Sequence, residues 1–219
     1  MNEFHDAKRV QTSLLSPLES YTLGKLVRFV PASISPDFLT FVGLLAMIFT
    51  GACYYASSYN PIFLLVATIG IFVNWLGDSL DGNIARYRNI QRPRYGFYID
   101  HIVDAFGIVF LVVGLVLSGL VSIVPAVSVL VGYLILSINA YLITYVDGQF
   151  QLSEWKMGPT EFRVCLVIIN IIVFFYPRVD YNNSTVLVFD IAGWIISALL
   201  VLILVSSVLR NAKRLRAIG

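Results

Sequence analysis

The stretch from Gly77 to Asp104, GDSLDGNIARYRNIQRPRYGFYIDHIVD, begins inside one long apolar segment of the chain and ends inside the next. Residues three or four positions apart on a helix lie on one face. Each half of the stretch carries two acidic residues at this spacing, namely Asp78 and Asp81 in the first half and Asp100 and Asp104 in the second. Asn89 and Pro93 lie between the halves and favour a turn. We therefore expect an antiparallel helical hairpin whose facing stripes bring four carboxylates together.

The composition of the whole chain places this hairpin in a membrane. Of the 219 residues, 58% are hydrophobic and 13% are charged, whereas soluble domains are about 45–50% apolar and about 25% charged. The apolar residues also form runs long enough to cross a bilayer. We expect an all-α integral membrane protein with six transmembrane helices, over residues 38–57, 62–86, 96–119, 122–145, 161–176 and 184–208.

The basic residues lie almost entirely on one side of these spans. They fall in the N-terminal segment, around the starts and ends of the spans on that side, and in the C-terminal tail: Lys8, Arg9, Lys25, Arg28, Arg86, Arg88, Arg92, Arg94, Lys156, Arg163, Arg210, Lys213, Arg214 and Arg216. The loops on the other side hold Arg178 as their one basic residue. Because short loops rich in Lys and Arg stay in the cytoplasm, we expect both termini and the acidic end of the hairpin to be cytoplasmic.

The chain divides into three regions on this prediction. Residues 1–37 form a cytoplasmic N-terminal interfacial segment, residues 38–209 form the six-helix membrane domain, and residues 210–219 form a basic cytoplasmic tail. The first thirty residues mix apolar and charged positions, which predicts either a helix lying on the membrane surface or a partly disordered tail.

The four aspartates indicate a divalent cation. An aspartate at the centre of a membrane helix costs very roughly 2.5–3.5 kcal/mol on insertion scales, so such residues mark function. Four adjacent anions need protons or cations to coexist, and a site made only of oxygen ligands suits Mg²⁺ or Mn²⁺. A pair of such ions can clamp a phosphoanhydride for in-line displacement. The alternative is a charge network or a cation site without chemistry.

Three small residues, Gly82, Ala85 and Gly96, accompany the aspartates on the two stripes. They leave room for a nucleotide to lie against the helix backbones, or else they allow close helix packing. The sequence leaves both interpretations open.

These residues resemble the motif of the CDP-alcohol phosphotransferase family, also called the CDP-alcohol phosphatidyltransferase family. The motif is two Asp separated by two residues, then Gly, two residues, Ala-Arg, a spacer, and Gly, Asp and Asp at intervals of four. Here it reads Asp78, Asp81, Gly82, Ala85, Arg86, Gly96, Asp100 and Asp104. All eight positions match, although the spacer has nine residues where eight are usual. Six spans with cytoplasmic ends also resemble the family over most of the chain.

The resemblance implies a transferase of phospholipid synthesis. An acceptor hydroxyl would attack the donor phosphorus next to the alcohol, and CMP would leave. The ligands of two Mg²⁺ or Mn²⁺ ions would be Asp78, Asp81, Asp100 and Asp104. Asp104 would also be the general base, and the pocket for the CDP moiety would be formed by Gly82, Ala85, Arg86 and Gly96.

Three further positions resemble parts of the family. Asp37 and Thr40 lie where the family brings polar side chains to the nucleotide, or else they belong to ordinary helix capping. His101 follows Asp100, as in choline and ethanolamine phosphotransferases, where a histidine beside the third aspartate has a suggested role as base. Because it sits about 100° around the helix from its neighbour, a contact between helices is the alternative.

Glu161 and Arg163 open the fifth span. Similar segments lie at the edge of the acceptor cavity in part of the family, which implies contact with a polar head group. Otherwise, an early Glu favours a helix start and Arg163 anchors the span at the membrane interface.

The donor stays open between two pairs of substrates. CDP-diacylglycerol with a small alcohol acceptor suits the compact chain and is our main prediction, while CDP-ethanolamine or CDP-choline with a lipid acceptor suits His101. The resemblance also implies a homodimer in contact with membrane lipids, and no nucleic-acid partner is expected. A transporter or cation channel is the competing class, but confinement of the charges to one hairpin disfavours it.

Overall fold

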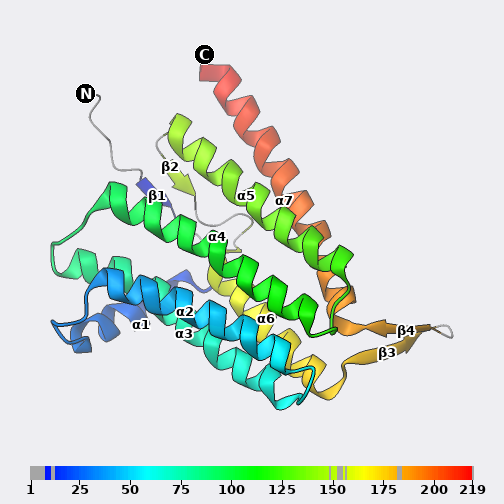
Figure 1. Ribbon diagram of the computed structural model, residues 1–219. Helices are drawn as coiled ribbons and strands as arrows, with labels where there is room; N and C mark the ends of the chain where they lie inside the picture. The colour runs from blue at the N-terminus through cyan, green and yellow to red at the C-terminus, as the bar shows by residue number, and fades with distance from the viewer. Residues whose placement is uncertain are drawn as a thin grey trace.

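The computed structural model describes residues 8–10, 13–147, 149–151, 155, 157–181 and 184–218, and helices dominate it (Figure 1). The helices in chain order are α1 (Ser16–Leu26), α2 (Pro36–Ala56), α3 (Ile62–Tyr87), α4 (Pro93–Leu117), α5 (Ile123–Asp147), α6 (Pro159–Phe175) and α7 (Val188–Ile218). A short 3-10 turn, Val27–Phe29, follows α1. Two pairs of short strands complete the described part, β1 (Lys8–Val10) parallel to β2 (Gln149–Gln151) and β3 (Arg178–Tyr181) antiparallel to β4 (Ser184–Leu187).

Five helices are long and apolar enough to cross a membrane, namely α2, α3, α4, α5 and α7. They coincide with five of the six predicted spans, so the prediction of a multi-pass helical membrane protein is confirmed. The helix α6 coincides with the predicted fifth span but has 17 residues, or about 25 Å at a rise of about 1.5 Å per residue. Its crossing of the bilayer stays a prediction.

The predicted start of the sixth span is wrong. Residues 184–187 form β4, which pairs with β3, and α7 begins only at Val188. Val179, Thr185 and Val186 are β-branched, and such residues favour strands over helices. At its other end α7 continues to Ile218, so the basic residues of the tail lie on the last turns of the same helix.

The N-terminal helix α1 packs across the end of α3 that carries the aspartates. Leu23 and Val27 form a small buried cluster there with Leu80 and Ile84 of α3. The described residues 13–29 are therefore ordered against the bundle, which excludes the disordered-tail alternative for them. The opposite face of α1 is exposed at Leu18.

Arg88, just after α3, binds the segment that connects α1 to α2. Its guanidinium donates hydrogen bonds to the backbone carbonyls of Val30, Pro31 and Ile34 at 2.6–3.1 Å. One side chain thus binds three carbonyls of this segment and holds it against the end of α3.

Glycines bring the backbones of α2, α3 and α4 into contact. A Cβ added at Gly77 of α3 would lie 2.7 Å from the carbonyl oxygen of Leu39 on α2, and one added at Gly114 of α4 would lie 2.0 Å from the carbonyl oxygen of Gly51 on α2. Such approaches allow no side chain. The two acidic helices are thus both held against α2.

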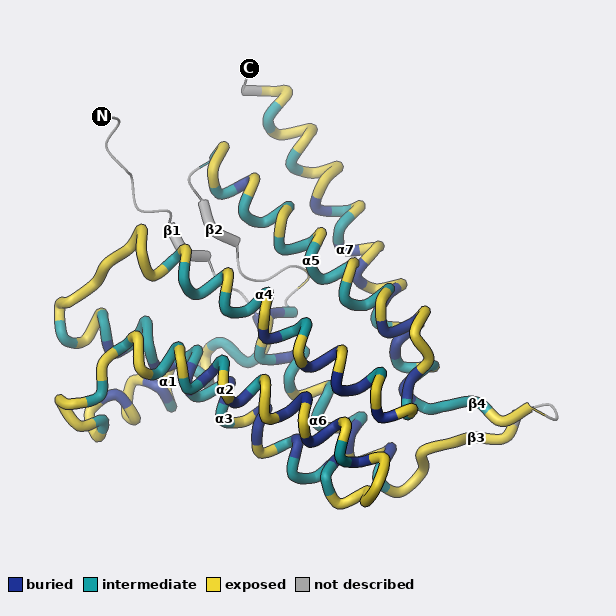
Figure 2. Tube along the Cα trace, viewed as in Figure 1, coloured by how far each residue is buried: buried dark blue, intermediate teal, exposed yellow. Residues whose placement is uncertain are grey.

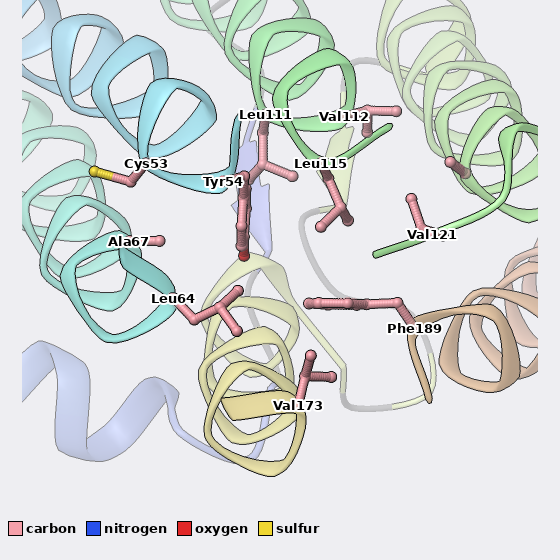
Figure 3. Close-up of a cluster of buried hydrophobic side chains, with 11 residues drawn as sticks. Cys53, Tyr54, Leu64, Ala67, Leu111, Val112, Leu115, Val121, Val173 and Phe189 are labelled. Carbon is pink, nitrogen blue, oxygen red and sulfur yellow. The ribbon is translucent and has the colours of Figure 1, made fainter. Parts of the chain in front are cut away.

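A cluster of buried apolar side chains lies in the part of the bundle away from the aspartates, and Figure 3 shows this cluster. Tyr54 of α2 is fully buried there and donates a hydrogen bond to Oδ1 of Asn170 on α6 at 2.8 Å. The ring of Phe189 from α7 meets the Tyr54 ring edge to face at 6.2 Å. This core joins α2, α6 and α7. The outer faces of the long helices are exposed (Figure 2) and carry large apolar residues such as Phe106 and Leu142, as suits lipid contact.

The helices α5 and α7 lie side by side as a pair (Figure 1). At one end, Asp190 of α7 accepts hydrogen bonds from the backbone N–H and the hydroxyl of Ser122, just before α5, at 2.6 and 2.7 Å. At the other end Arg214 pairs with Asp147 at 2.9 Å. Polar contacts thus join α5 and α7 at both ends, and the two helices pack as a pair beside the other helices.

Candidate active site

The structure brings the four aspartates of α3 and α4 together, as their spacing predicts. One oxygen from each of Asp78, Asp100 and Asp104 lies within 4.8 Å of the others. These three and Asp81 line one small cavity of about 10 Å³, which is about the room that one water-sized particle needs. Carboxylate oxygens around a space of that size can hold a divalent cation.

Asp81 is held by the start of α2. Its Oδ2 accepts a hydrogen bond from the hydroxyl of Thr40 at 2.6 Å, and its Oδ1 accepts one from the backbone N–H of Gly82. Thr40 thus lies in the acidic cluster. Ser35 supplies the helix cap of α2 by accepting from the backbone N–H of Phe38 at 3.1 Å, so capping does not explain Thr40.

Asp37 lies outside this cluster and pairs with Arg92. The distance from Nη2 of Arg92 to Oδ1 of Asp37 is 2.5 Å, and both side chains are about half exposed, at 55% and 46%. This hydrogen bond raises the pKa of Arg92. The ion pair links the start of α2 to the loop between α3 and α4.

Neither motif glycine packs against another helix among the described residues. A Cβ added at Gly96 would meet no atom of the described residues within 4 Å, and one added at Gly82 would lie 3.4 Å from the guanidinium of Arg86 on the same helix. Close helix packing therefore does not explain the small residues at these two positions. Ala85 is partly buried and Arg86 is exposed, with its guanidinium donating to Oδ1 of Asn83 at 3.2 Å.

Arg163 reaches from α6 into the acidic cluster. Its Nη2 donates to Oδ2 of Asp78 at 2.7 Å, and its Nε donates to Oδ1 of Asn74 at 3.0 Å. Interface anchoring does not explain these two contacts, and a role of Arg163 in the site stays a prediction. A guanidinium beside the carboxylates offsets part of their mutual repulsion.

Asn74 is a part of the site that the sequence reasoning missed. It is buried on α3 one turn before Asp78, and its amide N–H also donates to the carbonyl oxygen of Gly43 at 3.1 Å. The signal was present, because Asn74 continues the stripe of Asp78 and Asp81 at a spacing of four residues.

Glu161 has a structural place in the fold. Its carboxylate accepts hydrogen bonds from the backbone N–H of Gly158 at 2.8 Å and from that of Leu15 at 2.7 Å, and the residue is 7% exposed. Glu161 thus caps the start of α6 and ties it to the segment before α1. These contacts favour the helix-start interpretation over contact with an acceptor.

His101 lies in an aromatic stack at the edge of the site. Its ring centroid is 4.1 Å from that of Phe97 and 4.7 Å from that of Tyr141, and its Nδ1 is 3.4 Å from Oδ2 of Asp100. His101 thus makes the predicted contact between helices and also lines the large cavity described next. Its role in catalysis stays a prediction.

A cavity of about 350 Å³ opens beside the carboxylates and runs into the apolar interior. Asp78, Asp104 and Arg163 line one end, and its walls continue past Leu111 to Phe189. The pair of helices α5 and α7 contributes much of the far wall. A cavity of this size with a charged end and apolar walls is typical of a site for a small amphiphilic molecule.

Comparisons with known proteins agree with this geometry. The family model of CDP-alcohol phosphatidyltransferases matches residues 33–206. Cholinephosphotransferase 1 of Homo sapiens is 26% identical over 175 residues, which covers 76% of this chain and 42% of that protein. The protein of the same name from Gallus gallus is 27% identical over 176 residues, covering 76% of this chain and 51% of that protein. The one from Xenopus laevis is 33% identical over 118 residues, covering 51% and 29%.

The chain thus spans about half the length of these relatives, or less. The family model covers most of the chain and includes every residue of the motif around the acidic cluster. This protein therefore belongs to the CDP-alcohol phosphatidyltransferase family.

Proposed function

We propose that this protein is a metal-dependent membrane transferase that moves phosphocholine or phosphoethanolamine from a CDP-linked donor to the hydroxyl of a lipid, with release of CMP. One observation carries the proposal: the four carboxylates line a small cavity at the charged end of a large apolar one. A polar, phosphate-bearing donor suits the charged end, and the chains of a lipid acceptor suit the apolar walls.

The comparisons favour this donor over CDP-diacylglycerol, which is the main prediction from the sequence. The similar proteins are cholinephosphotransferases, and that name describes transfer of a phosphocholine group. The position of His101 beside Asp100 supports the same choice. CDP-diacylglycerol with a small alcohol acceptor is the outcome that the assay below must exclude.

The acidic cluster fits Mg²⁺ or Mn²⁺. Its donors are all carboxylate oxygens, which hard cations prefer, and three of them come within 4.8 Å of one another around a small cavity. We infer that the ligands of the two ions implied by the family are Asp78, Asp81, Asp100 and Asp104. Bound metal would supply positive charge to the phosphate oxygens of the donor.

Residues of this chain would accept the proton of the acceptor hydroxyl and would position the donor and the acceptor. The acceptor oxygen forms a new bond to phosphorus as the bond from phosphorus to the CMP oxygen breaks, and the hydroxyl proton passes to a carboxylate of Asp104. The family resemblance assigns this role to Asp104, which lines both cavities, as Asp78 and Asp100 also do. The acceptor would enter from the larger cavity. The open space beside Gly82 and Gly96 takes the nucleotide, near Thr40.

The placement in the membrane is also proposed. The acidic end of the bundle, the loop with Arg88 and Arg92 and the C-terminal end of α7 would face the cytoplasm. The helix α6 would make the sixth crossing, and α1 would lie at the interface with Leu18 and Phe29 in contact with lipid. Labelling of a cysteine introduced at position 91 from the outside of intact cells would contradict this orientation. Light scattering of the detergent-solubilised protein would test the homodimer that the family implies.

CMP release by the purified protein tests the function. CDP-choline, CDP-ethanolamine and CDP-diacylglycerol are each offered with diacylglycerol or with small alcohols, in Mg²⁺, in Mn²⁺ and in chelator. We expect metal-dependent CMP release with an amino-alcohol donor and a lipid acceptor, which is lost in Asp81→Asn and kept in the control Asp180→Asn on the distant hairpin. If CDP-diacylglycerol is the one donor of the three that yields CMP, the proposal of an amino-alcohol donor is refuted. Substrate flux into liposomes without CMP formation would favour a transporter.

A further inference from the structure

One carboxylate of α1 connects three helices beside the active site. The Oε1 atom of Glu19 accepts hydrogen bonds from the indole N–H of Trp75 at 3.2 Å and from the hydroxyl of Ser79 at 2.9 Å, and both donors are on α3. Its Oε2 accepts one from the hydroxyl of Thr160 at 3.1 Å, at the start of α6. The two oxygens of a carboxylate can accept several such bonds at once, so Glu19 bridges α3 and α6.

This bridge lies next to the ion pair that joins the same two helices inside the site. Ser79 directly follows Asp78, and Thr160 precedes Arg163 by three residues, which is nearly one helical turn. Asp78 and Arg163 bind each other at 2.7 Å. The helices α3 and α6 are therefore joined twice at this level, once by Arg163 within the site and once by Glu19 from outside it.

A second carboxylate, on α6, binds the segment before α1. Glu161 of α6 accepts a hydrogen bond from the backbone N–H of Leu15, which precedes α1, at 2.7 Å. Both Glu19 and Glu161 place negative charge at the N-terminus of α6, where the helix dipole favours anions. The first turn of α6 can neither rotate nor slide along α3 without breaking these contacts.

We propose that Glu19 is a positioning residue that sets the register of α6 against α3 and so keeps the Arg163 guanidinium on Asp78. This inference rests on the metal-dependent function proposed above. Without the bridge, the start of α6 can shift along α3, and Arg163 is held there only by its own bonds to Asp78 and Asn74. Its charge then competes with the cation for Asp100 and Asp104, and metal binding weakens.

A double-mutant cycle on metal binding tests the inference. Binding of Mn²⁺ to the purified full-length protein is followed by electron paramagnetic resonance, without donor or acceptor, in the wild type, Glu19→Gln, Arg163→Met and the double variant. We expect Glu19→Gln to weaken Mn²⁺ binding about three- to tenfold when Arg163 is present and less than about twofold when it is Met, since residues that act through one another couple to this extent. An equal effect in both backgrounds would overturn the positioning role.

Two further variants separate this role from a loss of folding. Thr160→Val breaks the same bridge from the side of α6 with little change of volume, so it should reproduce the loss and add nothing to Glu19→Gln. Tyr21→Ala changes the exposed face of α1 (Tyr21 is 62% exposed) and should leave Mn²⁺ binding unchanged. Additive effects of Thr160→Val and Glu19→Gln, or an equal loss in Tyr21→Ala, would also overturn the proposal.

The outcomes distinguish this inference from the proposed function. If the wild type binds Mn²⁺ and the cycle shows coupling but no donor yields CMP, the transferase proposal fails and the positioning role of Glu19 stands. If CMP release depends on metal and the cycle shows no coupling, the positioning role fails alone. A wild type that binds no Mn²⁺ overturns both.

Discussion

Gly96 tests whether the small residues of the motif make room for the donor. It lies in the first turns of α4 and is exposed, and a Cβ added there would meet no atom of the described residues within 4 Å. Gly114 lies on the same helix, but a Cβ added there would come within 2.0 Å of the Gly51 carbonyl oxygen. Gly96→Ala and Gly114→Ala are therefore the same substitution on the same helix, one in open space and one against a neighbouring backbone.

The structure sets the expected magnitudes. Alanine is better than glycine within a helix by roughly 0.5–1 kcal/mol, and about 1 kcal/mol shifts the melting temperature of a chain of this size by about 2–4 °C. Gly96→Ala should thus melt about 1–4 °C higher. Gly114→Ala overpacks a backbone contact at a cost of about 1–3 kcal/mol, which lowers the melting temperature by about 2–12 °C.

Gly96→Ala should weaken binding of the CDP-linked donor although it stabilises the protein. If the nucleotide lies against the backbone at Gly96, one added methyl group displaces it, and the KM for the CDP-linked donor should rise about tenfold or more. Scanning fluorimetry in detergent gives the melting temperature, and CMP release gives the KM. A Gly96→Ala protein with the donor KM of the wild type would refute the nucleotide assignment. A fall in melting temperature like that of Gly114→Ala would show that Gly96 packs against another helix.

Three other substitutions address the remaining site residues. Asp37→Asn should change the melting temperature by less than about 4 °C, because an exposed ion pair is worth about 0–1 kcal/mol; an increase in donor KM would assign Asp37 to the nucleotide. Arg163→Lys should lower kcat at least about tenfold in the CMP assay, because an ammonium cannot reproduce the two directed bonds of the guanidinium; full activity would show that charge alone suffices. His101→Phe keeps an aromatic ring between Phe97 and Tyr141 and should retain kcat within about tenfold, whereas loss of the base costs roughly 10²–10⁴-fold; a loss in that range would make His101 the base in place of Asp104.

Local spacing was sufficient to predict the acidic cluster. Asp78 and Asp81 are one turn apart on one helix, as are Asp100 and Asp104 on the next, and a short connection forces the two helices to run antiparallel. The period of the helix then leaves one arrangement in which all four carboxylates meet. Apolar runs predicted five of the spans in the same way, because length and hydropathy are local properties.

Contacts between distant segments were not predictable from spacing. Asp78 and Arg163 are 85 residues apart, and Glu161 and Leu15 are 146 apart, so no periodicity relates them. The prediction of where the last span starts was wrong for another reason. The residues before Val188 are apolar enough to extend a membrane helix, and hydropathy does not separate β-branched residues in a hairpin from those in a span.

Asn74 shows how one such distant contact could still have been inferred. The residue lies inside an apolar helix and is 5% exposed, and a buried amide must find hydrogen-bond partners. Its N–H group meets the Gly43 carbonyl at 3.1 Å, so its oxygen needs a donor from another helix. Among the predicted spans, Arg163 is the basic residue near the start of a segment whose polar end must face the aspartates. A buried amide oxygen needs a hydrogen-bond donor, and the carboxylate one turn further on favours a cation, so a guanidinium opposite the acidic stripe satisfies Asn74 and neutralises Asp78.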